Sequence, residues 1–296
     1  MENNVIETNI NIEKGNKNKK FNFKYLAKNK NEEIYLFGEN FVKNNKDKCY
    51  LIIDNTDCEL RSKYQFLKTG EQIVTLVIKD DNINFKGMFF FFDSFIDKLF
   101  IALMGMSSLY SKYKKINNLI DISSLENLDV SECEDLSFMF CGCVNVKNFD
   151  CLKNWDISKC KNLEGIFGYC SFSDVNFLSS WKFNNATNLC FMFGECYELK
   201  DIKGCKEWNV GNVENFWFMF RYCIKLTDVN DLQNWNMKNA RSIRFMFCGC
   251  ENLVNMNSLF KWKLNNKVDK YNIILGCNKL VNVPSIFEEN NSCEIF

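Results

Sequence analysis

Apolar residues recur with a fixed period along the second half of the chain. Starting from Cys143, equivalent cysteines follow in steps of 27, 26, 27, 27 and 27 residues, at Cys170, Cys196, Cys223, Cys250 and Cys277. Tryptophan keeps the same period, at Trp155, Trp181, Trp208, Trp235 and Trp262. Periods in this range are typical of solenoids, in which each coil buries its apolar edge against its neighbours. The period therefore predicts a solenoid with about 27 residues per coil.

Within one coil, the spacing of the apolar residues changes from the first half to the second. The second half has the spacing i, i+3, i+4, i+7 of one helical face, at Phe216, Met219, Phe220 and Cys223. The first half carries β-branched Ile202 and the alternating pair Trp208 and Val210, which suit a short strand. Strands of successive coils would lie about 4.8 Å apart and pair in parallel. The pattern predicts a parallel β sheet with short helical turns.

Changes in pattern divide the chain into four predicted parts. Residues 1–20 are expected to form a disordered basic arm, because Lys14 to Lys30 contains seven lysines and no acidic residue. Residues 21–87 contain alternating runs and the probable turn sequence "IDNTDC", which predict a small β-rich module that covers the first edge of the solenoid. The solenoid itself, of about seven coils, is expected over 88–287. Residues 288–296 remain as a C-terminal tail.

The overall composition excludes several functional classes. Thirty-seven basic and 37 acidic side chains cancel, so no general attraction draws the chain to nucleic acid. The sequence has no histidine, which removes the commonest general base and the commonest zinc ligand. We expect no nucleic-acid partner, no small-molecule substrate, no cofactor and no metal site. The lysine-rich start leaves nucleic-acid binding or a nuclear address as the weaker alternative to a solvated tail.

No segment is expected to enter a membrane. The N-terminus lacks an apolar run behind a positively charged start, so no secretory signal is predicted. The apolar stretch from Met88 to Met106 is interrupted by Asp93, Asp97 and Lys98, whereas a membrane-spanning helix needs about 20 largely uncharged residues. These features predict a cytoplasmic protein.

The sixteen cysteines have a structural explanation and two functional ones. Free cysteine behaves as a small buried apolar residue, and this role is the main prediction for the six periodic cysteines. Disulfides between stacked cysteines are the second possibility, and the "CGC" pairs that end at Cys143 and Cys250 suggest metal as the third. The metal alternative is weak because the spacing is not the C-x-x-C of zinc sites.

Every coil also carries Asp or Asn at one position. The position is occupied by Asp121, Asn148, Asp174, Asp201, Asp228, Asn255 and Asn282. Because Asp and Asn alternate, a short side-chain acceptor for nearby backbone N–H groups is the preferred explanation. An acidic stripe that binds a basic partner is the alternative.

A row of aromatic residues supplies the candidate interaction site. Phe138, Phe191, Phe218 and Phe245 precede the methionine of their coils, and Trp217 lies next to Phe218. If Met219 points into the core, its predecessor should be partly exposed, and partly exposed aromatic stripes are common at interfaces. Tyr169 and Tyr222 could extend the row. Packing between coils is nevertheless the preferred explanation for these rings, and binding is the functional alternative.

The coil sequences resemble a known family. The stretches "LKDIKGCKEWNVGNVENFWFMFRYC" and "LTDVNDLQNWNMKNARSIRFMFCGC" are similar to the BspA-type leucine-rich repeat family, with its Leu-x-x-Ile, Trp-Asn-Val and Met-Phe-x-x-Cys elements. The segment from Ile34 to Leu60 is similar to an N-terminal segment found with such repeats in some unicellular eukaryotes. The resemblance implies a leucine-rich-repeat-like solenoid that binds proteins, or adheres to them at the cell surface in bacterial relatives.

Together, these observations predict a non-enzymatic, intracellular scaffold that binds another protein. The candidate binding residues are Phe138, Tyr169, Phe191, Trp217, Phe218, Tyr222 and Phe245. The alternative is a BspA-type surface adhesin that is exported without a recognisable signal peptide. No catalytic residue is expected, and Glu195 in "MFGEC" is expected to contribute little to stability.

Overall fold

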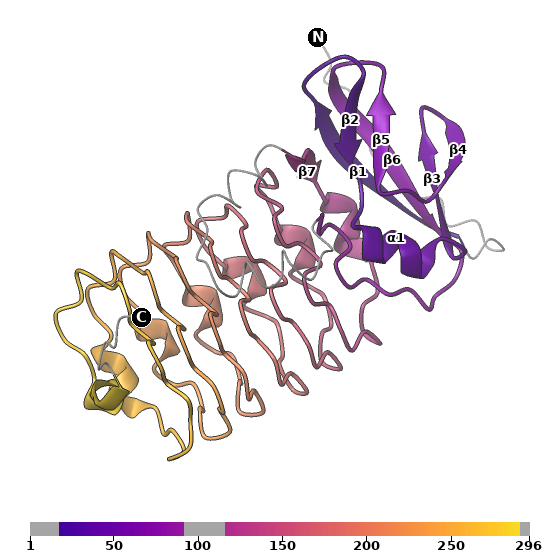
Figure 1. Cartoon of the computed structure of the whole chain (residues 1–296). Coiled ribbons are helices and arrows are strands. Elements are labelled where there is room, and N and C mark those ends of the chain that lie inside the picture. The colour runs from indigo at the N-terminus through magenta and orange to yellow at the C-terminus, as the bar shows by residue number, and fades with distance from the viewer. Residues whose placement is uncertain (1–17, 92–115, 291–296) are drawn as a thin grey trace, which may run out of the picture.

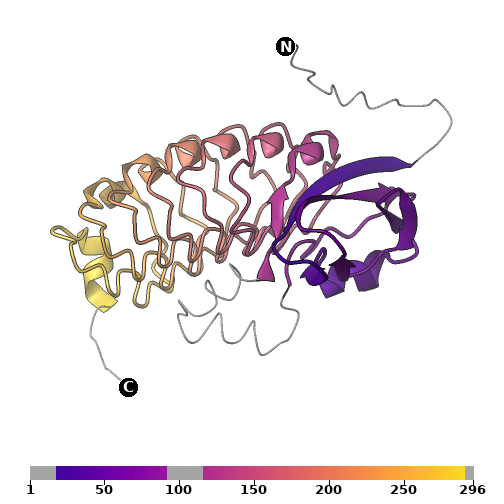
Figure 2. The same cartoon turned by 90° about the horizontal axis from the view of Figure 1, so that it is seen from above.

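The protein is elongated, with a β-rich module at one end and a row of stacked coils that runs from it to the C-terminus (Figure 1). The computed structural model describes residues 18–91 and 116–290. In the view from above, the coils lie side by side and their short helical segments line one long side (Figure 2). We refer to residues 119–290 as the coil stack.

The N-terminal module contains most of the regular strands. Its elements are β1 (Lys19–Ala27), β2 (Glu32–Tyr35), α1 (Glu39–Asn45), β3 (Cys49–Ile53), β4 (Thr56–Glu59), β5 (Lys63–Phe66) and β6 (Gly70–Ile78). A further strand, β7 (Leu119–Asp121), joins the main sheet, which has the order β4-β3-β6-β1-β7, while β2 and β5 form a separate pair. Every pairing between these strands is antiparallel.

The hairpin between β3 and β4 confirms the predicted "IDNTDC" turn. Ile53 pairs with Thr56, and Asp54 and Asn55 between them have φ angles of 51° and 61°. Two successive residues with positive φ form the type of turn that matches the twist of a hairpin, and Asp and Asn tolerate that conformation.

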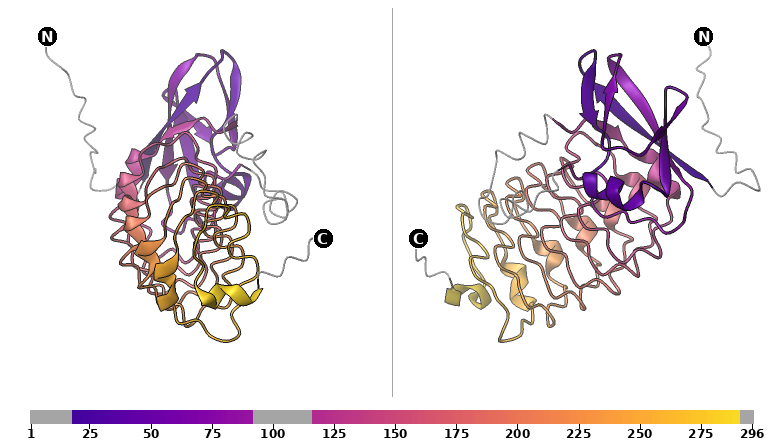
Figure 3. Two further views of the ribbon diagram at one scale, coloured as in Figure 1. Left: turned by 90° about the vertical axis from the view of Figure 1, so that its left-hand side faces the viewer. Right: turned by 45° about the vertical axis from the view of Figure 1, so that its right-hand side comes forward.

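Each coil contributes one short 3-10 helix rather than a strand and an α-helix. The 3-10 helices are η1 (Ser123–Asn127), η2 (Asp150–Leu152), η3 (Asn176–Leu178), η4 (Lys203–Cys205), η5 (Asn230–Leu232), η6 (Asn257–Lys261) and η7 (Ser285–Asn290). Seen along the stack, η1 to η6 lie in one row, and η7 lies away from it (Figure 3). The coils between them consist of turns joined by isolated parallel bridges, such as Asn162 with Asn188 and Asp174 with Asp201.

The predicted fold class is therefore wrong. The sequence pattern predicts a leucine-rich-repeat-like solenoid on a continuous parallel sheet with short helical turns, but the sheets are antiparallel and lie mainly in the N-terminal module. The stretch from Phe216 to Cys223 is a series of turns. Phe218 and Tyr222 have φ angles of 59° and 53°. A left-handed residue interrupts an α-helix, so the i, i+3, i+4, i+7 spacing arises here without one.

A row of backbone hydrogen bonds joins each coil to the next. The amides of Leu136, Phe138, Phe140 and Gly142 donate to carbonyls of Asn162, Glu164, Ile166 and Gly168, at 2.8 to 3.0 Å. The intervening amides, such as Met139 and Cys141, bond locally to the carbonyl three residues earlier. Alternate N–H groups thus point along the stack, and the backbone polar groups find hydrogen-bond partners without a regular sheet.

Equivalent side chains form ladders through the core. The rings of Phe140, Phe167, Phe193, Phe220 and Phe247 stack with centroids 5.5 to 6.0 Å apart. Each periodic tryptophan donates its indole N–H to a carbonyl of the preceding coil, as Trp208 does to Leu178 at 3.1 Å. Each periodic cysteine from Cys170 onward donates its thiol to the carbonyl of a core phenylalanine, as Cys223 does to Phe193. The predicted packing role is confirmed by the burial of Cys143, Cys170, Cys196, Cys223 and Cys250, while Cys277 in the last coil is partly buried.

The predicted Asx ladder is confirmed in six coils. In each, the Asp or Asn side chain accepts the backbone N–H two residues on, as Asp121 does from Ser123 at 2.8 Å and Asn148 does from Asp150 at 2.7 Å. The ladder ends at Asn282, because the residue two positions on is Pro284, which has no N–H. This hydrogen bond explains why the coils carry Asp or Asn at this position, so the alternative of an acidic stripe that binds a basic partner is not required.

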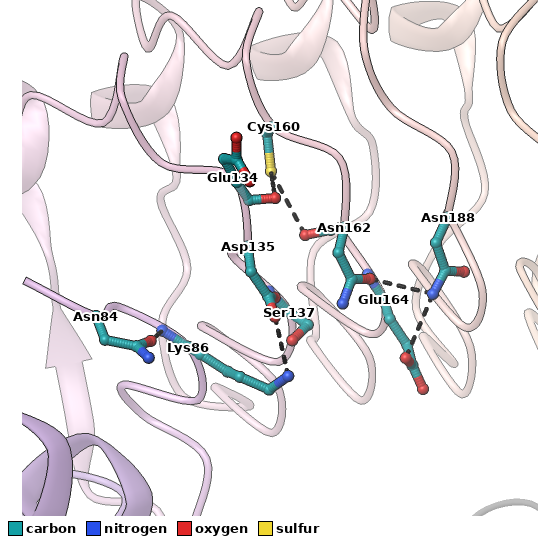
Figure 4. Close-up of polar contacts among 9 residues, drawn as sticks. All are labelled: Asn84, Lys86, Glu134, Asp135, Ser137, Cys160, Asn162, Glu164 and Asn188. Atoms are coloured by element: carbon teal, nitrogen blue, oxygen red, sulfur yellow. Dashed lines mark hydrogen bonds and ion pairs between the residues drawn. The ribbon is translucent and has the colours of Figure 1, made fainter.

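The module and the coil stack are joined by backbone and side-chain contacts. The amides of Gly87 and Phe89 donate to the carbonyls of Ser137 and Met139, which continues the row of bonds between coils. Lys86 bridges to Asp135 at 2.9 Å, and further along the same row Asn188 donates to Asn162 at 3.1 Å (Figure 4). The module thus covers the carbonyl edge of the first coil.

Parts of the predicted domain division lie outside the described residues. This holds for residues 1–17 of the basic arm, for 92–115 of the predicted solenoid and for 291–296 of the tail. Lys19 and Lys20, which were predicted within the arm, belong to β1, and η7 extends to Asn290. The four-part division itself stays a prediction.

Removing one ring of the phenylalanine ladder should destabilise the fold strongly. We expect Phe193→Ala or Phe220→Ala to lower the free energy of unfolding by about 3 to 5 kcal/mol, because each ring is fully buried and leaves a cavity. Chemical denaturation followed by circular dichroism measures the change. Phe260→Ala is the matched control, since that ring is 66% exposed on η6, and an equal loss there would contradict the ladder as the main stabilising contact.

Candidate protein-binding face

Left-handed backbone angles place a second set of side chains outside the core. Positive φ occurs at two positions of each Met-Phe-x-x-Cys segment, as at Phe218 and Tyr222. Side chains at these positions form a separate apolar group, which we call the outer cluster. Its buried members are Phe90, Phe138, Cys141, Val144, Tyr169, Cys190, Phe191 and Phe218, and Ile116, Trp217 and Phe245 pack against them. The coils therefore present one apolar row inward and another outward.

The structure gathers six of the seven predicted binding residues in this cluster. Tyr222 lies beside it, next to the guanidinium of Arg221. The predicted partial exposure is correct for Trp217, Tyr222 and Phe245. It is wrong for the other four, which are buried: Phe138, Tyr169, Phe191 and Phe218.

Close packing over glycines explains the burial of two of these rings, Phe138 and Phe191. A Cβ atom at Gly165 would lie 2.5 Å from the ring of Phe138 in the preceding coil. A Cβ atom at Gly194 would lie 2.2 Å from the ring of Phe191. Each ring therefore occupies space that only glycine leaves free. These four residues serve coil packing, and the open part of the face lies further along the stack.

One outer row changes its residue type from coil to coil. The row consists of the residues two positions after the bridge-forming Asp, Asn or Ser, namely Ser137, Glu164, Cys190, Trp217, Arg244 and Tyr271. We call it the outer row. Its first three members are small or acidic, and its last three are aromatic or cationic. Sequence reasoning found Trp217 and missed Arg244 and Tyr271, although the 27-residue period would have aligned all three.

A groove of about 350 Å³ lies along the second half of the outer row. It is lined by Glu214, Asn215, Trp217, Arg241, Ser242, Arg244 and Asp269. We call it the Trp217 groove. Two ion pairs cross it from coil to coil, Glu214 with Arg241 at 3.1 Å and Arg244 with Asp269 at 3.3 Å. The groove is thus held by three successive coils.

Trp217 and two arginines line the groove, and further aromatic rings pack beside them. The Trp217 ring stacks on Phe218 with centroids 4.6 Å apart, and the Arg244 guanidinium lies 5.1 Å from the Tyr271 ring centroid. Two donors, Nε1 of Trp217 and Nε of Arg244, have no hydrogen-bond partner among the described residues, although both atoms are buried. A buried donor without an acceptor costs free energy, so a ligand that supplies an acceptor would gain from pairing with it.

Next to the groove lies a buried ion pair that involves Glu195. The side chains of Glu195 and Arg221 are 1% and 8% exposed, and the two groups are 4.0 Å apart. Tyr197 donates its hydroxyl to Glu195, and the Arg221 guanidinium lies 4.6 Å from the Phe218 ring centroid. The expectation that Glu195 contributes little to stability stays a prediction, and the burial of its carboxyl argues against it. The φ angle of 62° at Glu195 turns its side chain away from the core and under the aromatic residues.

Burial controls the protonation of Glu195. Removal from water raises the pKa of its carboxyl from 4.5 to about 7, while the hydrogen bond from Tyr197 and the charge of Arg221 partly oppose this shift. The carboxyl is thus near its midpoint at neutral pH. Because Oε1 accepts no hydrogen bond within the described residues, ionisation leaves the charge incompletely compensated.

Burial also raises the pKa of many thiols. It raises that of Cys133 to about 11 and that of Cys49 to about 12, and it raises the pKa values of the fully buried ladder cysteines well above the ordinary value. A thiol rather than a thiolate disfavours both nucleophilic attack and metal binding. In the ranges 18–91 and 116–290, no group of three or more Cys, Asp or Glu side chains is arranged to hold a metal ion.

Comparison with known proteins gives one match. A model of the family described as "Mycoplasma protein of unknown function, DUF285" matches the chain over residues 104–206 and again over 173–286. The two overlapping matches cover more than half of the chain and agree with its internal repeats. No curated protein and no solved structure matches the chain. Over the described residues, no helix has both the length and the apolar character needed to span a membrane.

The Glu195 carboxyl should make stability depend on pH. Because its pKa is higher in the folded protein than in the unfolded chain, its contribution is complete below about pH 4.5 and is lost as the pH rises through about 7. We expect the unfolding free energy of the wild type to fall over this range, by up to about 3 kcal/mol, relative to Glu195→Gln. Urea denaturation at several pH values measures the difference.

A matched variant separates this effect from general acid titration. Glu198 is a partly exposed glutamate in the same coil, paired with Lys225. Glu198→Gln should keep the wild-type pH dependence. An identical slope for Glu195→Gln and the wild type would contradict the assignment to Glu195.

Proposed function

We propose that this chain, which belongs to the Mycoplasma family of unknown function DUF285, is a non-enzymatic scaffold that binds another protein through the Trp217 groove. The likeness of its coils to the BspA-type repeat family, in the elements Trp-Asn-Val and Met-Phe-x-x-Cys, supports this role at the level of the repeat unit. We also propose that the chain is related to the BspA-type repeat family and that its partner is intracellular.

The observation that carries the proposal is the contrast between the inner and outer rows. Inward positions repeat almost unchanged, with phenylalanine at five successive steps of the core ladder. The outer row instead varies from Ser137 to Trp217, Arg244 and Tyr271. Packing requires similar residues at equivalent positions, whereas recognition requires particular residues at one place. The outer row behaves as a recognition surface would.

The residue types in the groove support protein binding in particular. Tryptophan, tyrosine and arginine are the residues most enriched among those that dominate binding energy at protein interfaces. Trp217, Phe245 and Tyr271 are at least partly exposed and lie within three neighbouring coils. Tyr271 packs edge-on against Phe245, with ring centroids 5.6 Å apart. The rings are thus positioned in advance, which reduces the entropy lost on binding.

The absence of enzymatic activity is part of the proposal. The sequence has no histidine to act as general base, and the raised pKa values of the buried cysteines disfavour a thiolate nucleophile. The proposal also assigns no small-molecule substrate, no cofactor and no nucleic acid to the chain.

Substitution in and beside the groove should weaken partner binding without unfolding the protein. We expect Trp217→Ala combined with Phe245→Ala to weaken binding by about 30-fold or more, the effect of losing a residue worth about 2 kcal/mol at an interface. Quantitative affinity capture from native lysate, followed by mass spectrometry, measures the loss. Thermal melting by circular dichroism must show that the variant is folded.

A control ring on another side of the stack makes the result specific. Phe260 is exposed on η6, and Phe260→Ala should leave every captured partner in place. Equal capture by the wild type and the groove variant would contradict the proposal. Protease added to intact cells locates the protein: digestion would favour the surface adhesin, and protection would favour an intracellular scaffold.

A further inference from the structure

The charges of the coil stack are distributed unevenly along its length. Residues 119–220 contain 15 acidic and eight basic side chains, which give a net charge of −7. Residues 221–287 contain four acidic and ten basic side chains, which give a net charge of +6. The full chain is neutral, so the overall composition does not reveal this uneven distribution of charge. The Trp217 groove lies where the basic half begins.

Arginine is concentrated at the same place. The chain has only four arginines among its 37 basic residues, and three of them are Arg221, Arg241 and Arg244. Arginine differs from lysine because its planar guanidinium presents five N–H donors and can pair with a carboxylate through two parallel bonds. A chain that otherwise uses lysine thus places arginine in and beside one groove.

The ion pairs in the groove leave part of each guanidinium available. Arg241 contacts Glu214 through Nε, and its side chain is 76% exposed. Arg244 contacts Asp269 through one terminal nitrogen, and its Nε has no partner among the described residues. The acidic residues therefore orient the two guanidinium groups without using all of their donors.

The orphaned donors define what a ligand must offer. Nε1 of Trp217 and Nε of Arg244 both lack an acceptor among the described residues, and the two side chains that carry them line an open groove on the stack. Backbone carbonyls and side-chain carboxylates of an extended peptide supply acceptors for both kinds of donor. The aromatic ring of Trp217 adds apolar contact area beside them.

We propose that the Trp217 groove binds an extended, acidic peptide segment of the partner protein. This inference rests on the proposed function and specifies its ligand. Carboxylates of the peptide pair with Arg241 and Arg244, and a backbone carbonyl accepts the indole N–H of Trp217. The net positive charge of residues 221–287 attracts such a segment, and the net negative charge of the preceding coils orients it toward the C-terminal half.

A nucleic acid fits this surface less well than an acidic peptide. Glu214 and Asp269 lie in the groove itself, where they would repel a phosphate backbone with a charge at every nucleotide. The acidic coils that precede the groove would repel a longer strand. A peptide can instead place its acidic residues opposite the arginines and neutral residues opposite Glu214 and Asp269.

Selection from a displayed library of random peptides tests the inference on the full chain. We expect the selected peptides to be enriched in Asp and Glu, and a labelled peptide from this set to bind at least tenfold more weakly to Arg241→Gln combined with Arg244→Gln. Fluorescence anisotropy measures the binding.

Two single variants test the donor groups one at a time. Trp217→Phe, which keeps a ring and removes the N–H, should weaken peptide binding severalfold. Arg244→Lys should not restore full binding, because lysine lacks the planar donor group.

A charge-matched control separates the groove from the general positive field. Lys225→Gln combined with Lys238→Gln removes two positive charges from the same half of the stack, at residues that do not line the groove. This variant should retain most of the binding. Equal losses in both double variants would overturn the inference, as would stronger binding of single-stranded DNA that depends on the same arginines. If the arginine variant does not fold, Trp217→Phe decides the question.

The outcomes also distinguish this inference from the proposed function. Selected peptides without acidic enrichment, or no selected peptides, would overturn the acidic ligand. Loss of captured partners in the Trp217 and Phe245 variant would still support the scaffold. Acidic peptides that bind through Arg241 and Arg244 would support the inference.

Discussion

The structure depends on the backbone hydrogen bonds that run from each coil to the next. Alternate amides in every Met-Phe-x-x-Cys segment donate to carbonyls 25 or 26 residues further along the chain. This arrangement requires left-handed backbone angles at two positions per coil, including bulky residues such as Phe218 and Tyr222. Such angles are costly for residues with a side chain, so the packing of their rings must offset the strain. The hydrogen bonds between coils and the packing of the rings therefore depend on each other in this fold.

The same backbone angles create the surface on which the proposed function depends. Because the chain reverses its local handedness at these positions, some side chains leave the core and form the outer cluster. Near the start of the stack, the outer residues are small or are buried over glycines such as Gly165 and Gly168. Toward the C-terminal end, Trp217, Arg244 and Tyr271 replace them and frame a groove. One packing rule thus produces closed coils at one end and an open groove at the other.

The ion pairs of the coil stack differ between its surface and its interior. The ion pairs Glu214 with Arg241 and Arg244 with Asp269 join neighbouring coils at the surface, where solvent screens them and each contributes little to stability. Their larger effect is to fix the direction of two guanidinium groups. The Glu195 and Arg221 pair is different, because both groups are buried and desolvation outweighs their attraction. Its burial between aromatic residues makes this position sensitive to protonation near neutral pH.

The sequence alone determined which residues are equivalent. Period and residue type identified the phenylalanine, tryptophan and cysteine ladders and the Asx position, because stacking like side chains requires the same residue at each step. The hairpin at Asp54 and Asn55 could also be predicted, since few residues tolerate two positive φ angles in succession.

Only the tertiary structure decided the conformation of the coils and the location of the open surface. A spacing of i, i+3, i+4, i+7 is compatible with a helix and with a series of turns, and the choice depends on bonds to a coil 27 residues away. The burial of Phe138, Phe191 and Glu195 depends likewise on rings and glycines in neighbouring coils. A local pattern cannot specify such contacts, because their energies arise only when distant segments are brought together.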